Sequence, residues 1–119
     1  MSQSLFERLG GNEGCTAIAS DLVDNHLGNK AISKRFESAN VAALKNGAAT
    51  FLIAGTGGEP VYKGKDMLET HKGMNISAIE FMAVLDDALN ALESNNVGQR
   101  EKEEVLFILH SMRKDIILV

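Results

Sequence analysis

Apolar residues recur every three or four positions along most of the chain, the spacing that places side chains on one face of an α-helix. This pattern predicts long helices over residues 12–27, 41–54, 77–94 and 99–117, and a short turn-rich piece over residues 29–36. The alternation typical of strands is absent, and the sequence contains one proline. Ser77 and Glu80 have the spacing of a capping box that would begin the third long helix. The sequence therefore predicts an all-α fold.

Residues 55–76 interrupt this helical pattern. The segment begins at the glycine-rich Gly55-Thr-Gly57-Gly58 and has room for only one or two helical turns, around residues 67–71. Loops of this length are uncommon in small domains unless they have a function. His71 lies near the end of the segment, in an apolar frame. Neutral imidazole is the commonest side-chain ligand for transition metals, so His71 is a candidate metal ligand; the alternative is a partly exposed loop histidine.

Composition and charge narrow the class of protein. We expect 119 residues to form a single domain, residues 1–119, with one core. The net charge is −4 and the twelve Lys and Arg form no stripe, which argues against nucleic-acid binding. Cys15 is the one cysteine, and the sequence shows neither a signal peptide nor a membrane span. These features predict a soluble, cytoplasmic monomer.

A further set of residues carries a resemblance to a known family. It runs from Leu5-Phe-Glu-Arg-Leu-Gly-Gly11 to Gly57-Gly58-Glu-Pro-Val-Tyr62, then to Gly64, Met67, His71, Gly73 and Ile76, and also includes Phe36, Phe51, Phe81 and Val84. In this ordered set the chain resembles the group I truncated haemoglobins along essentially its whole length. The resemblance implies a truncated globin-like two-over-two sandwich of helices around one haem b per chain.

The resemblance also implies roles for individual residues. His71 would be the proximal ligand of the haem iron, and Phe36 would pack on the porphyrin face. Tyr62 and Lys63 would contact the haem propionates, with Lys65 a weaker candidate. For the aromatic residues and Met67, the alternative is plain packing in a hydrophobic core. For Lys63 and Lys65, the alternative is a solvated basic loop. The walls of the pocket would be formed by Phe51, Met67, Phe81 and Val84, with Leu109 further back.

The sequence departs from the family on the distal side of the expected haem. Most group I members have a tyrosine and a glutamine there that hydrogen-bond the oxygen ligand. The matching positions hold Val23 and Ala48, with Leu44 and Leu52 as neighbours, and none can donate a hydrogen bond. A missing charge-assisted bond is worth roughly 1.5–3 kcal/mol, so oxygen should dissociate about ten to a hundred times faster. We therefore expect weak oxygen binding in an apolar pocket.

The sequence leaves open the role of His26 and the choice between several functions. His26 follows Val23 by one turn; we expect a partly buried histidine at a helix end and a five-coordinate iron, with coordination by His26 as the alternative. The expected function is reversible binding of oxygen, carbon monoxide or nitric oxide. Nitric oxide dioxygenation, served by a reductase, is one alternative, and a helical interaction module that has lost haem is another.

Overall fold

The computed structural model describes residues 3–119, so Met1 and Ser2, the first residues of the predicted domain, lie outside it. The described residues contain six α-helices and two 3₁₀ turns, and no strand beyond one isolated parallel bridge between Ile76 and Ile117. In chain order they are α1 (Leu5–Arg8), α2 (Gly11–Gly28), η1 (Ser33–Phe36), α3 (Val41–Gly55), α4 (Met67–His71), α5 (Ala78–Ser94), α6 (Gln99–Ser111) and η2 (Arg113–Asp115).

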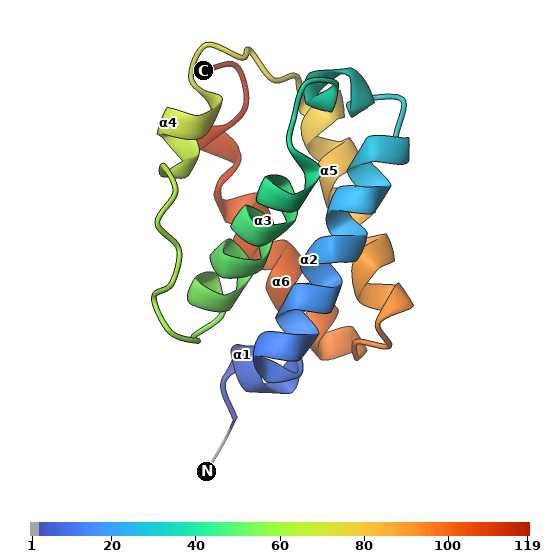
Figure 1. The fold of residues 1–119 in the computed structure, drawn as a ribbon, viewed down its shortest axis with the longest axis vertical. Helices are drawn as coiled ribbons and strands as arrows, with labels where there is room; N and C mark the ends of the chain where they lie inside the picture. Colours follow the sequence, from blue (N-terminus) through green and yellow to red (C-terminus); the bar gives the residue numbers. More distant parts are fainter. Residues whose placement is uncertain (1–2) are drawn as a thin grey trace.

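Two helix pairs make up the body of the molecule, as Figure 1 shows. Helix α2 packs against α3, α5 packs against α6, and α2 also contacts α5. This arrangement is the predicted two-over-two sandwich. The chain ends beside α4, at the end of the molecule opposite α1. The segment around the expected ligand His71 therefore lies next to the last residues of the chain.

Local chemistry explains where several helices begin. Ser77 and Glu80 form the predicted capping box at α5, since the Glu80 N–H donates to the Ser77 hydroxyl and the Glu80 carboxylate accepts from the Ser77 N–H. Asp66 caps α4 by accepting the Glu69 N–H at 2.7 Å. Gly14 lets α2 pass close to α1, because a Cβ there would stand 1.9 Å from the Leu9 carbonyl oxygen.

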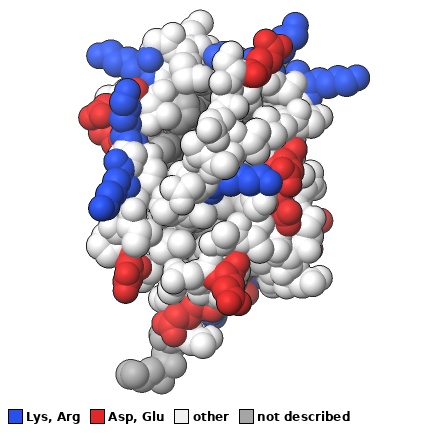
Figure 2. Space-filling model, viewed as in Figure 1, with Lys and Arg blue, Asp and Glu red and all other residues white. Residues whose placement is uncertain are grey.

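The main core lies between α1, α2, α3, α5 and α6. Cys15 and Leu92 are fully buried in it, and Ile18, Ile53 and Val105 pack with them. None of the described helices is long and apolar enough to cross a membrane. On the face drawn in Figure 2, Lys and Arg are interspersed with Asp and Glu.

One helix boundary differs from the sequence prediction. The pattern predicted a last helix to residue 117, but α6 ends at Ser111. Met112 takes φ −89° and ψ 0°, the single turn η2 follows, and the chain then turns back towards α4. There the Leu118 N–H donates to the Ile76 carbonyl at 2.9 Å, so the apolar residues 116–118 cover the loop after α4.

Candidate functional site

A largely apolar cavity of about 270 Å³ lies between α4, η1, α3, α5, α6 and the C-terminal residues. Its volume is just below the usual range of small-molecule sites, about 300–1,000 Å³. Three methionines line it, and their unbranched side chains adapt readily to a bound molecule. The structure brings seven of the sequence-predicted residues into its wall: Phe36, Phe51, Met67, His71, Phe81, Val84 and Leu109.

His71 is the last residue of α4 and is half-buried in the wall of this cavity. Its Nδ1 lies 2.8 Å from the backbone carbonyl oxygen of Met67. A carbonyl can only accept, so Nδ1 carries the hydrogen and the neutral ring keeps its lone pair on Nε2. Metal-binding histidines commonly donate their other ring N–H to a carbonyl in this way. His71 therefore has the tautomer of a metal ligand through Nε2.

The loop after His71 is held by the end of the chain. The N–H groups of Gly73 and Asn75 both donate to the Val119 carbonyl oxygen, at 3.0 and 3.3 Å. Gly73 has φ +87°, a left-handed conformation that glycine adopts without strain. Met112 and Ile116, from the same C-terminal stretch, also line the cavity. The position of α4 thus depends on residues more than forty positions later in the sequence.

Arg35 and Glu80 form an ion pair in the cavity wall that the sequence did not reveal. The guanidinium binds both carboxylate oxygens, one of them from Nη2 at 3.1 Å. The Arg35 guanidinium, followed by the Ser77 backbone N–H, lowers the pKa of Glu80 to about 2. The one available signal was Arg35 preceding the expected wall residue Phe36. The other lining residues missed from sequence are Ile32, Thr70, Met74, Ile76, Leu85, Met112 and Ile116.

The three residues expected at the haem propionates, Tyr62, Lys63 and the weaker candidate Lys65, lie outside the cavity wall. Tyr62 is half-buried, packs edge-on against Phe51 at a centroid distance of 5.2 Å, and donates its hydroxyl to the Lys65 carbonyl at 2.7 Å. Lys63 and Lys65 are exposed and are not among the lining residues. Tyr62 thus supports the wall residue Phe51 from behind.

The four residues expected on the distal side also lie outside the lining. Val23 is buried in α2, and Leu44 and Ala48 are half-buried in α3. Leu52 packs against the main core. Their proximity to a bound cofactor therefore remains a prediction from the resemblance.

His26 lies at the end of α2, behind the cavity wall. Its Nδ1 is 2.7 Å from Oδ2 of the buried Asp87, and its ring stacks on Phe36. The side chain is 13% exposed and does not line the cavity. This position agrees with the expected partly buried histidine at a helix end. His110, the third histidine, is exposed on α6 and packs edge-on against Phe81.

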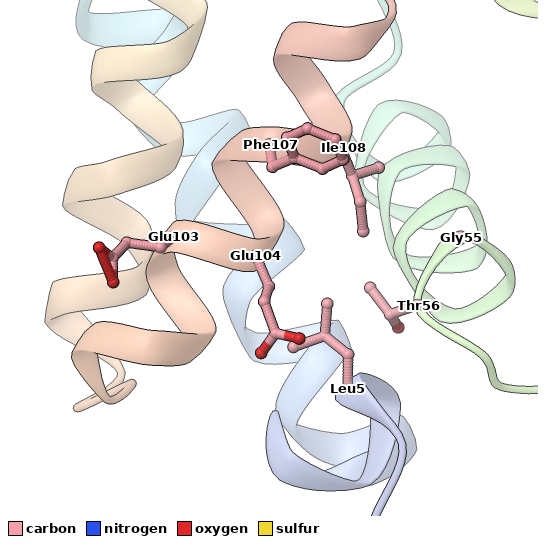
Figure 3. A pocket seen from close by; sticks show the side chains of 7 residues that line it. All are labelled: Leu5, Gly55, Thr56, Glu103, Glu104, Phe107 and Ile108. Carbon is pink, nitrogen blue, oxygen red and sulfur yellow. The ribbon is translucent and has the colours of Figure 1, made fainter.

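Another hollow lies towards the N-terminal end of the molecule, between α1, the end of α3 and α6 (Figure 3). Its polar side chains are Thr56, Glu103 and Glu104. The Thr56 hydroxyl donates to the Leu52 carbonyl at 2.7 Å, and the Glu104 carboxylate is paired with Arg8. This hollow contains no histidine, so its chemistry does not compete with that of the His71 cavity.

Comparison with known proteins gives concordant matches. A family model described as bacterial-like globin matches residues 4–118. A group 1 truncated hemoglobin of Tetrahymena pyriformis is 27% identical over 115 residues, which cover 97% of this chain and 95% of that protein. A group 1 truncated hemoglobin of Mycolicibacterium paratuberculosis is 26% identical over 113 residues, covering 95% and 83%. The crystal structure of the Tetrahymena pyriformis truncated hemoglobin in its Fe(III) form superposes with a TM-score of 0.94, at 26% identity, over 98% of this chain and 100% of that one.

Proposed function

Because the chain belongs to the bacterial-like globin family, whose members bind diatomic gases at haem, we propose that it holds one haem b through His71 and binds such gases reversibly. The observation that carries this proposal is the 2.8 Å hydrogen bond from His71 Nδ1 to the Met67 carbonyl, which leaves Nε2 free for a metal. Haem, when bound, supplies the iron that coordinates the gas.

The residues of the wall suit a porphyrin. Phe36, Phe51 and Phe81 offer flat apolar surface, and a porphyrin needs such walls together with a few cationic groups at its rim. Among the lining residues in the described part of the chain, Arg35 is the only lysine or arginine, and it would pair there with a propionate. Tyr62 and Lys63, which the resemblance implies for that role, are second candidates.

The polar side chains of the wall offer no free neutral hydrogen-bond donor. The Thr70 hydroxyl donates to the Lys65 carbonyl at 3.3 Å, and His71 donates to Met67. Arg35, the charged donor of the wall, gives Nε and Nη2 to Glu80, and its remaining N–H groups are those proposed for a propionate. Val23, Leu44 and Ala48, the proposed distal residues, carry no donor either. A gas ligand that gains negative charge on binding would therefore be weakly held. We accordingly propose rapid oxygen release, compatible with gas carriage or with binding of carbon monoxide or nitric oxide.

The spectrum and ligand kinetics of the ferrous protein test this function. We expect the broad absorption of a five-coordinate iron and oxygen dissociation about ten to a hundred times faster than from a relative with distal tyrosine and glutamine. Sharp split bands of a low-spin iron would contradict the five-coordinate site. Sustained conversion of nitric oxide to nitrate with an added reductant would instead support the alternative, a nitric oxide dioxygenase.

A further inference from the structure

A buried polar cluster joins α2 to α5 behind the cavity wall. Asp87, 5% exposed, is its centre. His26 Nδ1 lies 2.7 Å from one carboxylate oxygen, and Asn29 Nδ2 lies 3.1 and 3.2 Å from the two oxygens. Among residues 3–119 no lysine or arginine pairs with this carboxylate. An ionised carboxylate can only accept, so the His26 Nδ1 hydrogen points at Asp87 and the plane of the imidazole ring is fixed.

The fixed ring of His26 lies flat against the ring of Phe36. The two centroids are 5.7 Å apart and the ring planes differ by 8°, within the range of offset stacking. Phe36 lines the cavity, whereas His26 does not. A continuous chain of contacts therefore runs from the buried carboxylate to the surface that would face the cofactor.

The backbone that follows Phe36 gives its ring little support. Phe36 is the last residue of the single 3₁₀ turn η1, and residues 37–40 after it are exposed. A single 3₁₀ turn has poorer hydrogen-bond geometry than a longer α-helix. The ion pair between Arg35 and Glu80 ties this turn to α5, but the orientation of the Phe36 ring itself depends on its packing partners.

We propose that Asp87 and His26 are positioning residues that hold the Phe36 ring against the face of bound haem. Asp87 fixes the orientation of the His26 ring through its hydrogen bond with Nδ1, and stacking on His26 in turn orients the Phe36 ring. The same hydrogen bond keeps His26 behind the wall and away from the iron. This inference rests on the proposed haem site, but it assigns a role to residues that do not touch the cofactor.

The test compares hemin-loaded wild-type protein with Asp87→Ala, His26→Phe and the control Asp86→Ala. Asp86 is the exposed neighbour of Asp87 on the same helix, and His26→Phe keeps a flat ring but loses the anchor. Transfer of hemin to excess apomyoglobin measures release, and proton NMR of the ferric cyanide complex shows whether haem sits in one orientation or two. We expect Asp87→Ala to release hemin about tenfold faster, the effect of losing a hydrogen bond to a charged group. It should also show a second set of haem methyl signals, with His26→Phe intermediate and Asp86→Ala like wild type.

Urea unfolding of the haem-free variants separates positioning from plain structural support. If Asp87→Ala lowers only the unfolding free energy, while hemin release and the single set of methyl signals stay as in wild type, the inference is wrong. Should Asp87→Ala fail to fold, His26→Gln removes the stacked ring and must show the same second set of signals. Wild-type protein that takes up no hemin would overturn the proposed function as well, whereas wild-type behaviour of the loaded variants would overturn the inference alone.

Discussion

His71 and His26 are both half-buried histidines whose Nδ1 is held by an oxygen atom, yet their surroundings assign them different chemistry. His71 donates to a backbone carbonyl of its own short helix and lies in the cavity wall. His26 is held by Asp87, a carboxylate 61 residues away, and its ring covers the back of Phe36. Burial alone therefore does not identify a metal ligand. What distinguishes the two residues is that His71 lines the cavity and His26 does not.

The largest expected effect is on hemin uptake, when His71 or His26 is replaced with alanine in separate variants. His71→Ala should abolish stoichiometric hemin uptake, because it removes the Nε2 lone pair proposed to bind the iron. His26→Ala should still take up one hemin per chain, since the ring lies outside the cavity. Titration of each haem-free variant with hemin, followed by Soret absorbance, measures both. Added imidazole should restore part of the spectrum of His71→Ala, and full uptake by that variant without imidazole would contradict the ligand assignment.

The sequence predicted the fold well because helical periodicity is a local signal. The four long helices, the short turn of α4 and the capping box at Ser77 all appear in the structure. The prediction was wrong at the end of α6, where apolar residues 116–118 continue the helical pattern but pair with Ile76 instead. The periodicity of these residues could not reveal that partner, which lies forty positions earlier.

The site was predictable only in part for the same reason. The wall residues Phe36, Phe51 and Phe81 were expected from the resemblance to the truncated haemoglobins, and the structure places them around one cavity. Arg35–Glu80 and His26–Asp87 join residues that are 45 and 61 positions apart, so no local pattern pairs them. Such contacts depend on how α2, η1 and α5 pack together.

On the side of the cofactor opposite His71, Leu44 is the position at which a hydrogen-bond donor to the gas ligand can be introduced. Leu44→Gln introduces an amide of similar size at a half-buried position of α3. If Leu44 faces the gas ligand, the new donor should slow oxygen dissociation about tenfold or more, as expected for a charge-assisted hydrogen bond. Stopped-flow replacement of oxygen by carbon monoxide gives this rate. Asn46→Gln, an exposed change on the same helix, should leave the rate unchanged. An unchanged rate in Leu44→Gln as well would mean that Leu44 does not face the gas ligand.

On the His71 side, the C-terminal residues provide a second test. Deleting residues 117–119 removes the backbone hydrogen bonds to Gly73, Asn75 and Ile76. We expect hemin release several-fold faster, up to about tenfold, because each backbone hydrogen bond contributes roughly 1 kcal/mol and the loop can relax partly. Leu118→Ala is the matched control, since the Leu118 side chain is 67% exposed and the backbone bonds remain. Equal release rates for the deletion and the control would show that α4 holds its position without the C-terminus.

The smallest expected effect concerns the Arg35–Glu80 pair, which links η1, the turn that carries Phe36, to the start of α5. The pKa of Glu80 is about 2 in the folded protein, below its ordinary value of 4.5, so its stabilising effect is present above about pH 4.5. That effect should disappear as the pH falls from about 4.5 to about 2, because the unfolded chain then binds a proton that the folded chain does not. Solvent screens this partly exposed pair, so Glu80→Gln should lower the unfolding free energy of the haem-free protein by about 1 kcal/mol or less at pH 7. Urea unfolding at a series of pH values measures the difference in unfolding free energy between wild type and Glu80→Gln, and this gap should close as the pH falls from about 4.5 to about 2. The control Glu37→Gln, an exposed change just after η1, should show no such gap. A gap that persists unchanged at pH 2 would mean that the stabilisation comes from packing of the side chain and not from its charge.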